Sequence, residues 1–199
     1  MIGTKLSYNE DDSLSAKGRK VGVSGQAYFD VRHKNDLPFL VKCNGLTINV
    51  LGTKFDVSNY PETGIIQVVL ESGKIVLTND SLKVFNYTLH PGEMAEYNTA
   101  RKTINITTPD LNKYISWKDG MLVFKNDPLK LVLEKLEKWY NIDIQVKDTA
   151  VYQSVFTGTI KHESYEQILR LIEFSCSVNC RIINNTETGS VPEVILSKK

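Results

Sequence analysis

The C-terminal half of the chain contains a strand–helix–strand pattern twice, with a constant offset of 36 residues between the copies. In each copy, apolar residues at i, i+3, i+4 and i+7 predict a helix with one apolar face, and alternating apolar residues predict a following strand. The matching pairs are Leu129 and Tyr165, Val132 and Ile168, Leu133 and Leu169, Leu136 and Ile172, Ile142 and Val178, Ile144 and Cys180, and Val146 and Ile182. Strands are also expected before each helix, at 121–124 and 155–160, and at 194–196. The pattern predicts a small α+β domain of two β-α-β repeats, whose helices each cover one face of a shared sheet.

The sequence also predicts where the two helices begin. Asp127 precedes Pro128, which is the arrangement of an N-cap followed by a proline in the first helical position. Ser164 is followed three residues later by Gln167, which is the pattern of a capping box. We therefore expect the helices to begin near 128 and 165.

The first 108 residues show a different pattern. Short runs of alternating apolar and polar residues are separated by turn residues, and there is no helical period. The alternating apolar positions are Leu46, Ile48 and Val50, then Phe55 and Val57, then Ile66, Val68 and Leu70, then Ile75 and Leu77. Frequent turns between short strands predict an all-β domain, an antiparallel sandwich or a barrel-like sheet. The predicted organisation is the β domain at 1–108, a linker at 109–114 and the α+β domain at 115–199.

Composition narrows the classes of partner. Lysine and arginine number 24 and aspartate and glutamate 23, so the net charge is +1. A protein that follows a phosphate backbone normally carries a concentrated positive charge, so we expect no nucleic-acid partner. No apolar run approaches the roughly 18 residues that a membrane-spanning helix needs.

The residues that usually carry chemistry are few and scattered. Cys43, Cys176 and Cys180 lack the paired spacing of zinc ligands and are expected to be buried free thiols. The three histidines form no metal-binding or nucleophile motif. The sequence therefore predicts no catalytic site, no metal, no cofactor and no small-molecule substrate.

Trp139 and Tyr140 end the first predicted helix and are the candidate partner-binding residues. Both residue types are enriched among the residues that dominate binding at protein interfaces. Packing in the core or between domains is the alternative, and it is the commoner use of such side chains.

Several segments together carry a resemblance to a known family. They read GQAYFDV (25–31), PFLV (38–41), LTINVLGTKFDV (46–57), LHPGEMAEY (89–97) and WKDGMLVF (117–124). In this order and spacing they resemble the extracytoplasmic part of FecR-type sigma-factor regulators, which are anti-sigma factors. The C-terminal repeat is similar to the secretin/TonB short N-terminal (STN) domain, which agrees with the duplicated β-α-β pattern.

The resemblance implies a periplasmic signalling protein whose full length is anchored in the inner membrane. Its partners would be the signalling domain of an outer-membrane TonB-dependent transporter and an extracytoplasmic-function sigma factor. The sigma factor would be held by a cytoplasmic segment that this sequence does not contain. The family's opening strands would precede residue 3, so we expect a β domain without its first strands. The alternative function is a periplasmic carbohydrate- or cell-wall-binding β-sandwich module, and an enzyme ranks third.

Gly52-Thr53 adds a narrower expectation. Some members of the resembling family cleave themselves at a Gly-Thr bond, when the threonine hydroxyl attacks the preceding carbonyl. Glycine permits the strained backbone that such a step needs. The simpler interpretation is a glycine at a strand bend followed by a β-branched strand residue.

Overall fold

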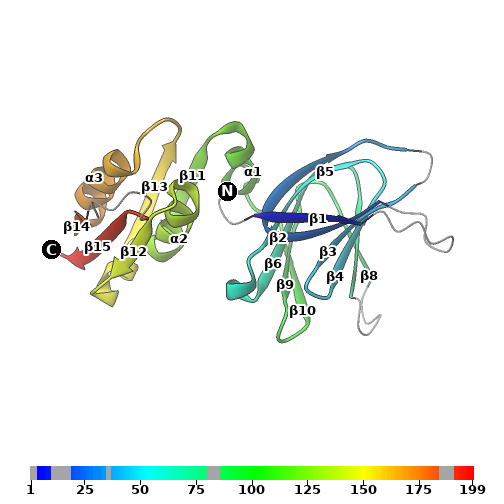
Figure 1. Ribbon diagram of the computed structural model, residues 1–199, viewed down its shortest axis with the longest axis horizontal. Coiled ribbons are helices and arrows are strands. Elements are labelled where there is room, and N and C mark those ends of the chain that lie inside the picture. The colour runs from blue at the N-terminus through cyan, green and yellow to red at the C-terminus, as the bar shows by residue number, and fades with distance from the viewer. Residues whose placement is uncertain (1–3, 10–18, 35–36, 80–85, 184–190) are drawn as a thin grey trace. The chain divides into compact units, whose positions relative to one another are not determined.

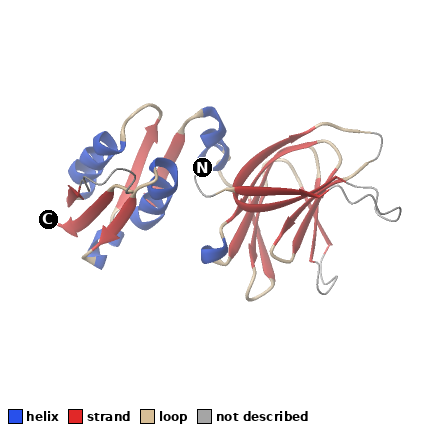
Figure 2. Cartoon of the chain, in the orientation of Figure 1, coloured by secondary structure: helices blue, strands red, loops and turns tan. Residues whose placement is uncertain are grey.

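The computed structural model describes residues 4–9, 19–34, 37–79, 86–183 and 191–199. The chain divides into two compact units, Gly3–Ile115 and Ser116–Lys199. The first unit is almost entirely strand and the second combines strands with helices (Figures 1 and 2). The mostly β architecture with a small C-terminal α+β region is therefore as predicted.

Strands of the first unit bury the residues that alternation selected. Leu46, Ile48, Phe55 and Val57 are fully buried, as are the alternating residues of the next two strands. The strands are β1 (Lys5–Asn9), β2 (Arg19–Val31), β3 (Phe39–Cys43), β4 (Leu46–Val50), β5 (Thr53–Asn59), β6 (Ile65–Ser72), β7 (Ile75–Asn79), β8 (Asn86–Leu89), β9 (Met94–Asn98) and β10 (Thr103–Thr107). A short 3-10 turn, η1 (Pro61–Thr63), precedes β6.

These strands form one sheet that curls around the larger of the unit's described apolar clusters (Figure 1). The order along the sheet is β10-β9-β6-β5-β2-β3-β4-β7-β8, with β1 added beside β2. All pairings are antiparallel except β2 with β3, which is parallel. The parallel pair departs from the purely antiparallel prediction, because β3 begins beside Arg19, at the start of β2, and runs in the same direction.

The parallel pair requires β2 to bend. A straight strand from Arg19 to Val31 would be about 40 Å long, whereas residues 32–38 can bridge at most about 28 Å. The bend coincides with Gly25, which has a φ of +104° that favours glycine. Before Gly25 the strand pairs with β1 and β3, and from Gly25 onward it pairs with β5. One long bent strand thus joins the two halves of the curled sheet.

Residues 109–114 were predicted as a linker, and the structure places part of them against the first unit. The short helix α1 (Asn112–Ile115) buries Ile115 in a small cluster with Val69 and Met94. Leu111 and Tyr114 pack against the same cluster. The division between the two units follows Ile115.

The second unit contains two helices of equal length at the predicted offset. Its elements are η2 (Ser116–Asp119), β11 (Leu122–Pro128), α2 (Leu129–Tyr140), β12 (Asp143–Val146), η3 (Thr149–Gln153), β13 (Val155–Ile160), α3 (Tyr165–Cys176), β14 (Val178–Ile183) and β15 (Glu193–Lys198). The predicted apolar faces are buried: Leu129, Val132, Leu133 and Leu136 in α2, and Ile168, Leu169 and Ile172 in α3.

The strands of this unit do not form the single shared sheet that the sequence predicted. One sheet pairs β11 with β13, and a second has the order β12-β15-β14. The last strand, β15, lies outside the repeat and inserts between β12 and β14. The 36-residue repeat in the preceding residues therefore could not predict where β15 pairs.

The two helix starts differ in how well the sequence predicted them. At α3 the Ser164 side chain accepts the Gln167 N–H and the Gln167 side chain accepts the Ser164 N–H, so the capping box is confirmed. At α2 the N-cap is Pro128, which caps with no side-chain hydrogen bond. Asp127 instead accepts the N–H of Lys125 at 3.0 Å. Asp127 is therefore not the N-cap, because β11 continues through Pro128.

Two further contacts recur at the same offset. The Glu137 side chain of α2 accepts the N–H of Ile144 in β12 at 2.9 Å. The Glu173 side chain of α3 accepts the N–H of Cys180 in β14 at 2.6 Å. Each helix also ends in a left-handed C-cap residue, with φ near +55° after α2 and +51° after α3. In both halves, therefore, a glutamate in the last turn joins the helix to the strand that follows it.

Glu137→Gln is expected to change how the stability of the chain depends on pH. Burial raises the pKa of Glu137 above its ordinary value of 4.5, and the nearby carboxylates of Asp143 and Glu134 raise it further, while the Ile144 N–H opposes them. A carboxyl group whose pKa is higher in the folded chain than in the unfolded chain contributes stability that is fully present below the unfolded pKa. This stability is lost as pH rises through the folded pKa. Urea unfolding measures the free energy of unfolding of both proteins at pH 4 and pH 7. The value for the wild type minus that for the variant should be larger at pH 4 than at pH 7, and an equal or larger difference at pH 7 would contradict this.

Candidate functional site

The second unit exposes two large apolar side chains on one helix. Phe174 of α3 is 88% exposed and Leu171, one turn earlier, is 53% exposed. Both lie outside the buried stripe of α3, which faces the core of the unit. A largely exposed phenylalanine beside a second apolar residue is a feature of protein-binding surfaces.

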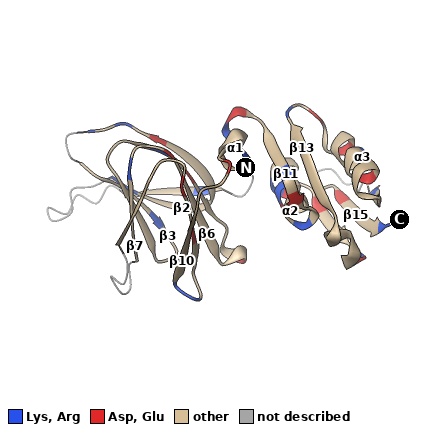
Figure 3. Ribbon diagram, turned by 180° about the vertical axis from the view of Figure 1, so that it is seen from behind, with Lys and Arg blue, Asp and Glu red and all other residues tan. Residues whose placement is uncertain are grey.

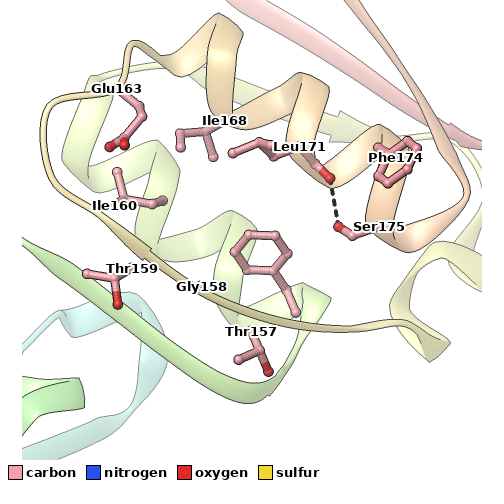
Figure 4. Close-up of a pocket in the computed structure, with 10 residues that line it drawn as sticks. Thr157, Gly158, Thr159, Ile160, Glu163, Ile168, Leu171, Phe174 and Ser175 are labelled. Carbon is pink, nitrogen blue, oxygen red and sulfur yellow. Dashed lines mark hydrogen bonds between the residues drawn. The ribbon is translucent and has the colours of Figure 1, made fainter.

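These side chains border a groove between α3 and β13. Figure 4 shows Ile168, Leu171 and Phe174 along one side of α3, across from residues 157–160 of β13. The lining residues are Phe156, Thr157, Gly158, Thr159, Ile160, Glu163, Ile168, Leu171, Phe174 and Ser175. We call this site the α3–β13 groove.

Gly158 shapes the floor of the groove. A Cβ atom at Gly158 would lie 3.0 Å from the ring of Phe156, which is closer than ordinary packing allows. The Phe156 ring therefore lies over the glycine, and a larger residue at 158 would displace it. Phe156 and Gly158 thus form part of the groove lining together with Leu171 and Phe174 of α3.

One charged residue, Glu163, lines the groove, and hydrogen bonds occupy its carboxylate. Glu163 accepts the N–H of Lys161 at 2.7 Å and of His162 at 3.0 Å. These backbone hydrogen bonds lower the pKa of Glu163, so it is ionised at neutral pH. The remaining lining groups are apolar side chains, hydroxyls and glycine.

Trp139 and Tyr140 do not line the α3–β13 groove. Both are partly buried at the end of α2. The Tyr140 hydroxyl donates to the Glu163 carbonyl at 2.7 Å, and its ring centroid is 6.3 Å from that of Tyr165. Burial raises the pKa of Tyr140. Tyr140 thus connects α2 to the start of α3, and a partner-binding role for Trp139 stays a prediction.

The sequence reasoning missed Phe174 and Leu171. The signal was present, because both are large apolar residues on the otherwise polar face of a helix whose buried stripe was already assigned. Periodicity alone identifies the buried stripe and assigns no role to apolar residues outside it. That Phe174 and Leu171 are exposed is seen only once α3 is packed against its unit.

Gly52 and Thr53 lie where β5 begins, beside the turn between β6 and β7. A Cβ at Gly52 would lie 3.0 Å from the Cβ of His33, so a close approach explains the glycine. Thr53 is buried, and its hydroxyl donates to the carbonyl of Lys74 at 2.9 Å. In this conformation the hydroxyl proton is held by a carbonyl of the turn between β6 and β7 rather than by a base.

Prolonged incubation of the purified chain is expected to leave a single uncleaved species. The physical reason is the engagement of the Thr53 hydroxyl, which must be freed before it can attack the Gly52 carbonyl. Intact-mass spectrometry over several days checks this, with Thr53→Ala as the control that lacks the hydroxyl. A pair of fragments, 1–52 and 53–199, formed by the wild type and not by the variant would establish self-cleavage.

The cysteines lie as expected for free thiols. Cys43 and Cys176 are buried, and Cys180 is partly buried. Burial, followed by the charge of Glu173, raises the pKa of Cys180 to about 12, so this thiol is protonated at neutral pH. Within the described ranges, no group of three or more His, Cys, Asp or Glu side chains is placed to hold a metal. No helix there has the length and apolar composition that crossing a membrane requires.

Comparison with known proteins identifies the family. Residues 3–76 match the model described as FecR protein, and residues 121–188 match the model described as FecR, C-terminal. No curated protein matches the chain. Each match falls within one of the two compact units.

Two crystal structures are similar along almost the whole chain. Both are named as "a putative anti-sigma factor from Parabacteroides distasonis". The first, at 1.65 Å resolution, is 26% identical with a TM-score of 0.79, and the alignment covers 99% of this chain and 87% of that chain. The second, at 2.50 Å, is 25% identical with a TM-score of 0.78 and the same coverage. With two family models matching in order over most of its length, the chain belongs to the FecR family of sigma-factor regulators.

Proposed function

We propose that this chain is the periplasmic part of a regulator that relays a signal from an outer-membrane TonB-dependent transporter to an extracytoplasmic-function sigma factor. It acts by binding protein and catalyses no reaction. The sigma factor is bound by a cytoplasmic segment of the full-length regulator, which is anchored in the inner membrane. The C-terminal unit receives the signalling domain of the transporter.

The observation that carries this proposal is the exposed apolar surface on the C-terminal unit. Phe174 and Leu171 border a groove whose lining holds one charged residue, Glu163. Such a surface suits a protein partner better than a sugar, because sugar sites need several converging polar groups. Acidic and basic residues are interspersed along α2 (Figure 3), so that helix offers no surface of a single charge sign.

We assign the C-terminal unit to the STN-like type, built from two related β-α-β segments. Equal helices 36 residues apart support this assignment, as do the left-handed C-caps and the paired contacts of Glu137 and Glu173. A duplicated unit of this kind leaves sheet edges and helix faces on both copies that can bind a partner.

Capture from an envelope extract tests the proposed function. The immobilised chain should retain a TonB-dependent transporter or its signalling domain, identified by mass spectrometry, while the chain unfolded in urea should not. Calorimetry between the purified chain and that signalling domain at physiological salt should then show saturable heat. Absence of any such heat would contradict the proposal. Saccharide binding without a protein partner would instead support a carbohydrate- or cell-wall-binding module.

A further inference from the structure

The exposed face of α3 differs from the equivalent face of α2. At the offset of 36 residues, Leu171 corresponds to Lys135 and Phe174 corresponds to Lys138. The amine of Lys135 lies 5.7 Å from the ring centroid of Phe124, so the lysine lies over this ring of β11. The same helix position is thus compatible with lysine in one copy. The apolar residues of the other copy are not needed to build the helix.

β13 offers an open edge next to this face. Over the parts of the chain that the structure describes, β13 pairs with β11 and with no other strand. The carbonyl of its first residue, Val155, accepts a hydrogen bond from the Cys176 thiol at 3.6 Å. The following residues, 156–160, border the α3–β13 groove. An unpaired edge presents backbone N–H and C=O groups that can pair with an added strand.

The size of the apolar surface indicates what kind of partner fits. Phe174 can bury at most about 150–250 Å², whereas a stable interface buries about 800 Å² on each partner. A second folded copy held by this surface alone would therefore be too weakly bound. An extended segment gains its affinity differently, because main-chain hydrogen bonds along the edge add to the contacts of a few side chains.

We propose that the α3–β13 groove binds one extended strand of the partner protein, which pairs with β13 and places alternate apolar side chains against Leu171 and Phe174. The inference rests on the proposed function, since it names the segment that the C-terminal unit receives. The central residues of this strand are uncharged, because the groove between Glu163 and Ser175 contains hydroxyls and apolar groups and no charge to pair with. Alternation follows from the period of two along a strand.

A peptide tests the groove independently of the natural partner. The probe is a capped seven-residue peptide that alternates valine with threonine between two terminal lysines, titrated to millimolar concentration into the ¹⁵N-labelled chain. Amide shifts should concentrate in residues 156–160 and in the second half of α3. The same peptide with N-methylated backbone amides should bind at least tenfold more weakly, because it cannot pair with a strand edge. Shifts elsewhere, no shifts, or equal binding of the methylated peptide would overturn the proposal.

A double variant transfers the lysines of α2 onto α3. Leu171→Lys with Phe174→Lys should weaken binding of the peptide at least tenfold while leaving the far-ultraviolet circular dichroism unchanged. The matched control is Leu131→Lys, which changes a leucine of α2 that is 49% exposed and should leave binding unaltered. Equal loss in the control and the double variant would overturn the proposal.

The outcomes separate this inference from the proposed function. If the chain captures a transporter signalling domain but the peptide does not bind, the groove is the wrong site and the function stands. If the peptide binds in the groove but no envelope protein is captured, the site stands and the function fails.

Discussion

Phe55→Ala is expected to lower the free energy of unfolding of the first unit by about 3–5 kcal/mol, the usual loss for a buried phenylalanine. Phe55 is fully buried at the centre of the curled sheet. Its ring stacks on that of Phe29 with centroids 5.0 Å apart, and Phe29 in turn contacts Phe39 at 5.8 Å. Alanine removes the aromatic contacts and leaves a cavity that the surrounding strands cannot fill by rotating.

This loss is a large fraction of the total stability of a typical domain, which is about 5–15 kcal/mol. Hydrogen exchange of the β2, β5 and β6 amides in rising urea measures it, because exchange through global opening reports on this unit. The control is Lys54→Ala on the same strand, whose half-exposed ion pair with Asp30 at 3.2 Å should contribute less than about 1 kcal/mol. A loss below 1 kcal/mol for Phe55→Ala would show that the stacked rings are not central to the core.

Gly73→Ala is expected to destabilise the first unit by about 2–5 kcal/mol, combining left-handed strain with displacement of a packed neighbour. Gly73 has a φ of +94° in the turn between β6 and β7. A Cβ there would lie 2.6 Å from the Gly52 carbonyl oxygen and 3.0 Å from the Thr53 Cα. Backbone atoms cannot rotate away, so the turn or the start of β5 must move. That movement disturbs the hydrogen bond from the Thr53 hydroxyl to the Lys74 carbonyl.

Gly45→Ala is the matched control for Gly73→Ala. Gly45 also has a left-handed φ, +86°, but a Cβ there would meet no atom within 4 Å. Its substitution should therefore cost only the conformational strain, about 1–2 kcal/mol. The difference between the two variants, measured by the same hydrogen exchange, isolates the close approach to Gly52. Equal losses would mean that the turn moves away without cost.

The family resemblance found in the sequence led to the correct family. The Gly-Thr pair shows how the same two residues are interpreted differently in the sequence and in the structure. In the sequence it suggested a reactive bond, whereas in the structure Gly52 and Thr53 each have a packing reason, the approach of His33 and the hydrogen bond to Lys74.

Local patterns in the sequence were enough to predict β4, β5, β6 and β7 of the first unit, the two helices and the capping box at Ser164. These features depend on residues close in sequence, whose periodicity and hydrogen bonding determine which face is buried. The pairing of β15 between β12 and β14, the parallel contact of β2 with β3, and the exposure of Phe174 were decided by the tertiary structure. Each depends on residues distant in sequence that meet only after the chain folds. A local hydrophobic period does not show which distant strand will pair with a segment, or which side chain will stay exposed.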